Sequence, residues 1–380
     1  MLKNILPIFL LTAVLFAPLA CASEKKETLP EIVIDATVRD AALLLGGQTL
    51  AANAALAPFT ESAEYRDWAK NVGAAWEKTQ ANNLVLIEEW RKSTLTNVFP
   101  KTIFSPFSGP DILNALAFFP QGNDFILFGL EPAGRIPQPE QLDDRQRMLE
   151  LRQMQSALSD ILSVNFFQTL HMKEQVKEDS CASFSGIIMF FLTRMNMEVI
   201  GARNISIDTN GMITAEYNPK DSNLTPGSEF LFRQSSENNT NTHEIKRVRY
   251  FSLDIADYML AIKDNFEKFA QTLPDCAAII KSASFLMHQD GFSRARKLVL
   301  DKSAYILQDD SGVPLRFFLN DNWTVDYFGY YDRPIPLFAN RFQRDLLTNM
   351  QSKSSGRLPF SYGYTHGPGR ANLILAGKNK

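Results

Sequence analysis

The chain has 380 residues and a formal net charge of −3, and 45% of its residues are hydrophobic while 21% are charged. This composition supplies enough apolar side chains for a sizeable core and excludes wholesale disorder. The charge is close to neutral and no long run of lysine or arginine occurs, so we expect no nucleic-acid partner.

The first 22 residues have the pattern of an export signal. Lys3 gives a short positive region, residues 5–17 are apolar, and Ala20-Cys21-Ala22 is a small-x-small cleavage pattern. The apolar stretch is shorter than the about 20 residues that a transmembrane helix needs. We therefore expect residues 1–22 to be a signal peptide. The mature protein should be exported, either periplasmic or secreted, and should have no transmembrane span.

Cys21 allows a second interpretation of the same segment. Leu19-Ala20-Cys21 resembles the lipobox of bacterial lipoproteins, in which the cysteine is lipidated, although Pro18 stands where leucine is preferred. On this alternative the protein is a membrane-anchored lipoprotein with its lipid anchor at Cys21.

Export places the other two cysteines, Cys181 and Cys276, in an oxidising compartment. A disulfide between them would close a long loop, which is worth about 4–5 kcal/mol in the chain-entropy model. The alternative is two separate buried thiols that act as small apolar groups. The sequence therefore predicts a disulfide between Cys181 and Cys276, with free thiols as the competing expectation.

The N-terminal part of the mature chain has helical periodicity. Residues 36–58 are rich in alanine, leucine and glycine, with Gly46-Gly47 as a break. Trp68, Val72 and Trp76 then recur at helical spacing, which predicts helical structure from about residue 62 to residue 95.

The segment 101–134 predicts a strand, a turn, a helix and a second strand. Residues 102–107 are β-prone, and Ser108-Gly109-Pro110-Asp111 has the residue types of a turn that leads into a helix at 112–119. The apolar run from Phe125 to Gly129 is typical of a strand buried on both faces, as in a parallel sheet. Together they predict a right-handed βαβ unit.

Beyond this unit the pattern alternates between helices and strands. We expect helices at 140–164 and 184–200, a β-hairpin-rich section at 203–254 with a turn at Asn210-Gly211, and mainly helical structure at 277–301. A meander of short strands within 304–330, a helix at 337–350 and a last hairpin within 360–376 complete the chain.

The fold class predicted from these elements is mixed α/β, with α+β as the alternative. It comprises a helical N-terminal part, a βαβ unit at about 102–130, and antiparallel meanders that alternate with helices. Residues 23–380 are expected to form one large domain, with a sub-boundary near residue 200.

The common catalytic signatures do not occur in the sequence. It contains no His-Glu-x-x-His, no Walker A loop and no Gly-x-Ser-x-Gly, and its four histidines are scattered. We therefore assign no metal ligands and expect no cofactor.

The residues from Phe104 to Glu131 resemble the first βαβ unit of class I methyltransferases. In that family a strand leads into a glycine-rich turn and a helix, and the next strand ends in an acid that holds the cofactor ribose. Here Glu131 lies 22 residues after Gly109, although the second glycine of the Gly-x-Gly turn is missing. The resemblance covers less than a tenth of the chain. The alternative is a purely structural βαβ unit with a solvent-exposed Glu131.

Ligands of open α/β sheets bind at the carboxyl ends of the strands. Because Asp111 and Glu131 follow two strands, we predict them as candidate catalytic carboxylates, with Ser105 and Ser108 as candidate ligand-binding residues. A second candidate is the loop 362–370, Tyr-Gly-Tyr-Thr-His-Gly-Pro-Gly-Arg, whose His366 and Arg370 could hold an anion.

Two functions follow as hypotheses. The first is an exported envelope protein of the bacterial type that has no enzymatic activity and binds an envelope ligand or a protein partner. The alternative is an exported hydrolase or transferase in which Asp111 and Glu131 divide acid and base roles at the strand ends.

Overall fold

The computed structural model describes residues 34–97, 99–164, 180, 183–235, 244–364 and 369–379. These residues form a mixed α/β fold around one sheet, which has ten strands in the described part of the chain. None of the helices among the described residues is long and apolar enough to cross a membrane. The predicted fold class is confirmed.

The centre of the sheet is built from parallel strands. β1 lies in the middle, β2 and β6 follow on one side of it, and β7 and β8 follow on the other. The strands up to β6 therefore lie on one side of β1. The next strand, β7, pairs with β1 on its other side, and β8 follows β7 there. The bounds of these strands are β1 Thr102–Ser105, β2 Asp124–Gly129, β6 Lys246–Ser252, β7 Cys276–Ile280 and β8 Ser303–Gln308.

Antiparallel strands extend the sheet at both edges. Beyond β6 lie β5, β3 and β4, and beyond β8 lie β10 and then β9. The hairpin predicted at Asn210-Gly211 joins β3 to β4, and Gly211 has a φ of +79° there. The bounds are β3 Met197–Ile207, β4 Ile213–Thr214, β5 Thr225–Gln234, β9 Trp323–Gly329 and β10 Asn372–Lys378.

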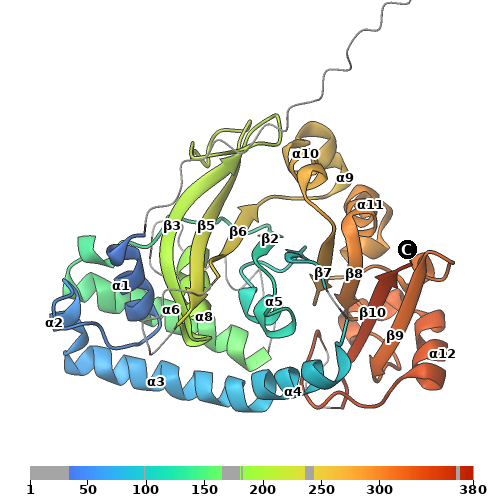
Figure 1. Cartoon of the computed structure of the whole chain (residues 1–380), viewed down its shortest axis with the longest axis horizontal. Helices are drawn as coiled ribbons and strands as arrows, with labels where there is room; N and C mark the ends of the chain where they lie inside the picture. The colour runs from blue at the N-terminus through green and yellow to red at the C-terminus, as the bar shows by residue number, and fades with distance from the viewer. Residues whose placement is uncertain are drawn as a thin grey trace, which may run out of the picture.

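Helices cover both faces of the sheet (Figure 1). One face is covered by α1 Ala36–Leu45, α3 Ala63–Thr79, α4 Val85–Thr94, α5 Ile112–Phe118, α6 Asp144–Val164 and α8 Phe184–Arg194. The opposite face is covered by α9 Asp257–Ile262, α10 Asn265–Thr272, α11 Ser293–Lys302 and α12 Arg344–Lys353. Because the sheet is buried on both faces, the central strands β2 and β7 contain continuous apolar runs, Phe125–Phe128 and Ala277–Ile280.

The side chains of β2 show how the two cores are separated. Phe125 and Leu127 pack into the core on the α5 side, whereas Ile126 and Phe128 pack into the core on the α10 side. This alternation follows from the period of two in a strand. The predicted βαβ unit is confirmed, since β1 and β2 pair in parallel on either side of α5 in the sequence.

Three predicted elements are wrong. The first residues of the stretch 277–301 form strand β7, because the short apolar run Cys276–Ile280 fits a buried strand as well as a helix. Among the short strands expected within 304–330, the one predicted between those at 304–308 and 323–330 is a single 3₁₀ turn at Leu315–Phe317. The last strand, β10, pairs with β8 and β9 instead of with residues 360–364, so it lies inside the sheet and not in a terminal hairpin.

A π-helical turn at Gln80–Leu84 joins α3 to α4 without a break in the helical rod. Such turns insert one extra residue into a helix and redirect a side chain. Here the buried Asn83 accepts a hydrogen bond from the Ser361 backbone N–H at 2.9 Å. The turn therefore fastens the segment that carries Tyr362 and Tyr364 to the helical layer.

Candidate functional site

A cavity of about 660 Å³ opens at the carboxyl ends of the parallel strands. Its walls come from the segments that follow β1, β2, β6 and β7, together with residues 335–338 and Tyr364. The strand order reverses at β1, and open α/β sheets bind their ligands at such a switch point. The volume lies within the range that small-molecule sites occupy.

The cavity walls are mostly apolar, with a few polar groups. The apolar part includes Phe107, Phe128, Ile255, Phe292 and Phe338. The polar groups lie at the strand ends and come from Glu131, Asp254, Ser282, Ser284 and Tyr364. Apolar walls with a small number of placed polar groups are the usual composition of a site for a small organic ligand.

Glu131 is buried at this edge of the sheet, with 3% of its surface exposed. The expectation of a solvent-exposed Glu131 is therefore wrong. A Cβ atom added at Gly129 would lie 2.6 Å from Glu131 Oε2 and 3.1 Å from the Cα of Gly109. Gly129 thus lets the Glu131 carboxylate and the loop after β1 come together over the end of β2.

Tyr250, on β6, holds the backbone beside this carboxylate. Its hydroxyl donates to the Glu131 carbonyl at 2.7 Å, and its side chain is fully buried. Burial and the charge of Glu131 raise the pKa of Tyr250 well above its usual value. The hydroxyl therefore stays protonated and remains a donor to this carbonyl.

Asp111 has a different environment from Glu131. It is the N-cap of α5 and accepts from the Asn114 backbone N–H at 3.0 Å, while Lys281 Nζ lies 2.9 Å from its Oδ2 atom. Both members of this ion pair are almost fully buried. Among the described residues that line the cavity, Glu131 is present and Asp111 is not, so the structure does not bring the two candidate carboxylates into one pocket.

The two candidate serines fasten the loop after β1. Ser105 Oγ donates to the Ile279 carbonyl of the neighbouring strand β7 at 3.2 Å. Ser108 Oγ donates to the Ser105 carbonyl at 2.8 Å. Neither side chain is among the cavity-lining residues, whereas Gly109, which follows Ser108, is.

The loop after β7 has a strained backbone. Ser282, Ser284 and Phe285 have φ values of 52°, 50° and 51°, and Phe107 across the cavity has a φ of 59°. Left-handed conformations are uncommon for residues with a side chain, and they gather at ligand-binding and active sites. The loop after β7 is thus a second polar wall of the site, which no local sequence pattern indicates.

Buried side chains hold this strained loop in place. Asp309 Oδ2 accepts from the Ser282 N–H at 3.0 Å, Ser311 Oγ accepts from the Ala283 N–H at 2.8 Å, and the Tyr364 hydroxyl accepts from the Ser284 N–H at 3.0 Å. The Ser282 hydroxyl is buried without a hydrogen-bond partner among the described residues. It is therefore an unsatisfied polar group within this wall of the cavity.

Asp309 and Asp310 follow β8 and are both buried. Burial raises the pKa of Asp309, and burial together with the charge of Asp309 raises the pKa of Asp310 to about 7. Asn372 Nδ2 donates to Asp310 Oδ1 at 3.1 Å. Within the described residues, no cluster of histidine, cysteine, aspartate and glutamate has the arrangement of a metal site.

The remaining candidate residues lie elsewhere. His366, Cys181 and Cys21 fall outside the described residues, and Arg370 is exposed and does not line the cavity. Cys276 is a free buried thiol whose Sγ lies 3.3 Å from the Lys302 carbonyl, and burial raises its pKa to about 11. The disulfide expected between Cys181 and Cys276 is therefore not part of the described structure.

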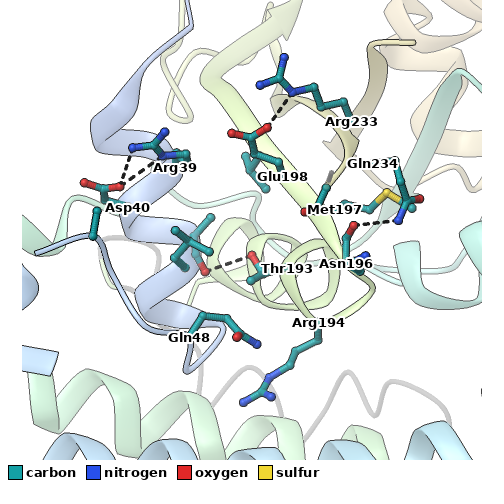
Figure 2. A pocket seen from close by; sticks show the side chains of 15 residues that line it. Arg39, Asp40, Gln48, Thr193, Arg194, Asn196, Met197, Glu198, Arg233 and Gln234 are labelled. Carbon is teal, nitrogen blue, oxygen red and sulfur yellow. Dashed lines mark hydrogen bonds and ion pairs between the residues drawn. The ribbon is translucent and has the colours of Figure 1, made fainter. Parts of the chain in front are cut away.

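A second hollow, of about 500 Å³, lies between α1, the end of α8 and strands β3 and β5 (Figure 2). Most of its charged side chains are paired with each other. Arg233 Nε lies 2.7 Å from Glu198 Oε2, and Arg39 Nη2 lies 3.4 Å from Asp40 Oδ1. This hollow borders the antiparallel part of the sheet, so the cavity at the switch point is the better candidate site.

Comparison with known proteins gives no match: no family model fits the chain, and neither a curated protein nor a solved structure is significantly similar to it.

Proposed function

We propose that this protein binds a nucleoside-type small molecule without phosphate groups in the cavity at the switch point. The observation that carries the proposal is the buried carboxylate of Glu131, which lines the cavity beside Gly109 at the end of the second strand. An acid at this place in a doubly wound sheet accepts hydrogen bonds from the ribose hydroxyls of a nucleotide cofactor.

The strand order supports a nucleoside ligand. Numbered by their order along the chain, the parallel strands follow each other across the sheet as third, second, first, fourth and fifth. This is the order of the classic dinucleotide-binding sheet up to its fifth strand. Beyond β8 the sheet continues with the antiparallel β10 and then β9.

The loop after β1 argues against a phosphate-bearing ligand. A pyrophosphate needs a second glycine for close backbone approach and an open helix N-terminus. Here Pro110 follows Gly109, and the Asp111 carboxylate occupies the N-terminus of α5 with Lys281 as its counter-ion. Since a carboxylate already stands where the pyrophosphate would bind, an uncharged nucleoside fits better than a dinucleotide.

The apolar walls would bind the base of the nucleoside, whereas Glu131 would bind its sugar. Phe107, Phe128 and Phe292 all line the cavity and present aromatic surface to it. Flat aromatic ligands gain both burial and ring stacking against such side chains. A nucleobase has the shape and the polarity for this environment, with its sugar at Glu131.

Two kinds of activity are compatible with this site, and we propose the non-enzymatic one first. Export, which residues 1–22 predict, removes the protein from the cellular supply of adenosyl cofactors, so an exported binding protein is the simpler assignment. A transferase is the second candidate, because the residues from Phe104 to Glu131 resemble the first βαβ unit of class I methyltransferases. In both cases Glu131 acts by binding the ligand, and Asp111 is engaged in its ion pair with Lys281.

A thermal-shift screen of the mature chain tests the proposal. Adenosine should raise the melting temperature in proportion to its occupancy, whereas ADP and NAD should not. Glu131→Gln should abolish the shift, and Glu216→Gln, a change of an exposed glutamate outside the cavity lining, should leave it unchanged. Equal shifts with adenosine and ADP, or an unchanged shift in Glu131→Gln, would contradict the proposal.

A labelling experiment separates the two candidate activities. The protein is incubated with S-adenosylmethionine that carries a labelled methyl group, together with an envelope extract. Transfer of label above that seen with Glu131→Gln supports the transferase, and binding without transfer supports the binding protein.

A further inference from the structure

The charged groups of the cavity are all of one sign. Among the described residues that line it, Glu131 and Asp254 are acidic, and none is lysine, arginine or histidine. Asp254 also accepts hydrogen bonds from the Ala256 N–H at 2.9 Å and from the Tyr258 hydroxyl at 3.0 Å. A ligand with a negatively charged group would therefore meet repulsion and no compensating ion pair.

Three of the apolar side chains that line the cavity are largely exposed to solvent. Leu130 is 51% exposed, Tyr258 is 64% exposed and Leu337 is 79% exposed, and all three line the cavity. They come from three separate segments, which are the end of β2, helix α9 and the 3₁₀ turn at Pro336–Arg341. Single exposed apolar residues are common on proteins, but three that line the same cavity place apolar surface where it meets solvent, and we call these three side chains the apolar rim.

The rim adjoins the proposed sugar position. Leu130 immediately precedes Glu131 in the chain, so the exposed end of the cavity lies next to the carboxylate that we assign to the ribose. A group attached to the sugar would therefore leave the cavity over Leu130, Tyr258 and Leu337. The base would occupy the deeper part, between the phenylalanines.

We propose that the ligand of this site is a nucleoside whose sugar carries an uncharged, apolar substituent that lies on this rim. The inference rests on the proposed function, because it assigns the sugar to Glu131. It narrows that function, since it disfavours nucleosides whose sugar bears a phosphate or an amino-acid group. The substituent would cover the three exposed side chains and gain the free energy of their burial.

A homologous series of probes tests this inference by calorimetry on the mature chain. The probes are adenosine and 5′-alkylthio-5′-deoxyadenosines with methyl, butyl and hexyl groups, and 5′-AMP is the charged comparison. The affinity should rise with chain length, by up to about fourfold for each methylene that is buried. 5′-AMP should bind more weakly than adenosine.

Variants of the rim residues separate the contribution of the substituent to the affinity from the contribution of the nucleoside. Leu337→Ser and Leu130→Ser should remove most of the dependence on chain length, when each affinity is taken relative to the affinity of the same variant for adenosine. Leu319→Ser is the matched control, because Leu319 is also 51% exposed but does not line the cavity. It should leave the whole series unchanged.

The possible failures are distinct. If adenosine binds but the affinity is flat or falls with chain length, or if 5′-AMP binds better than adenosine, the inference about the substituent is overturned and the nucleoside site stands. If neither adenosine nor any alkylthio derivative binds, the proposed function fails, and this inference fails with it. If the rise with chain length persists in both rim variants, the substituent does not lie on this rim.

Discussion

Lys281 Nζ lies 2.9 Å from Asp111 Oδ2, with both side chains almost fully buried between the ends of two neighbouring parallel strands. Asp111 follows β1 and Lys281 follows β7, so the pair joins the two strands on either side of the switch point. It also gives the N-terminus of α5 an internal anion. The consequence for function is that this end of the sheet is closed to a pyrophosphate, while the cavity beside Glu131 stays open.

Removal of one partner of this ion pair should be costly. Lys281→Met leaves the Asp111 charge buried without its cation, and such losses cost about 3–5 kcal/mol. The free energy of unfolding from urea titrations measures the effect. Lys92→Met removes one member of an exposed pair with Glu88 and should change stability by no more than about 1 kcal/mol. Equal effects of the two variants would show that the buried pair has no structural role.

Gly129→Ala tests the close approach of Glu131 to the loop after β1. The added methyl group would lie 2.6 Å from Glu131 Oε2 and 3.2 Å from the Gly109 nitrogen, so the carboxylate must move. We expect a loss of about 1–3 kcal/mol in stability and a larger loss of nucleoside affinity. Gly291→Ala is the control, since a Cβ there meets nothing within 4 Å. Wild-type affinity in Gly129→Ala would show that the carboxylate need not lie over Gly129.

Tyr250→Phe removes the donor that holds the Glu131 backbone. The carbonyl of Glu131 then loses its 2.7 Å hydrogen bond in a fully buried site, which costs about 1–3 kcal/mol. Urea unfolding and ligand titration should both report the change. Tyr305→Phe is the comparison, because no hydrogen bond of the Tyr305 hydroxyl occurs among the described residues, and it should be close to neutral. A neutral Tyr250→Phe would exclude a positioning role for this hydroxyl.

Asp310 should make stability fall as the pH rises from about 4 to about 7. Its pKa is 3.8 in an unfolded chain and about 7 in the folded protein, where burial and the charge of Asp309 disfavour ionisation. Between these values the folded state binds more protons than the unfolded state, so the free energy of unfolding decreases with pH. Above pH 7 both states are ionised and the contribution is constant.

Asp310→Asn should reduce the slope to the part that the raised pKa of Asp309 contributes. It should keep the contact with Asn372, since an amide oxygen can accept the same hydrogen bond. Asp321→Asn, at an exposed position, should keep the wild-type slope. Urea midpoints at several values between pH 4 and pH 8 decide the question. The same slope in Asp310→Asn and the wild type would assign the pH dependence to other groups.

The central βαβ unit could be predicted because its signals are local. The cap at Asp111, the prolines at 110 and 120 and the apolar run of β2 all act within a few residues, and the structure has the elements where these signals place them. Strand β7 could not be assigned in the same way. Its sequence Cys-Ala-Ala-Ile-Ile is short and apolar, and only its neighbours β1 and β8 in the sheet make it a strand.

The candidate site likewise has one part that local sequence signals predict and another part that depends on contacts between distant segments. Glu131 is found from the sequence because the end of an apolar strand is a local feature. The loop after β7 is not, because the positive φ angles of Ser282, Ser284 and Phe285 depend on Asp309, Ser311 and Tyr364, which are distant in the chain. The apolar rim likewise combines three segments that only the folded sheet brings together.

The most direct test of the central claim is a thermodynamic cycle that combines removal of the Glu131 carboxylate with removal of the ribose hydroxyls. Calorimetry measures the binding free energy for each combination of protein and ligand. Adenosine and 2′,3′-dideoxyadenosine are titrated into the wild type and into Glu131→Gln. If Glu131 holds the sugar, removal of the hydroxyls should weaken binding to the wild type by about tenfold or more, and should have little effect on binding to the variant. An equal loss in both proteins, or no binding of adenosine to the wild type, would contradict a nucleoside site at Glu131.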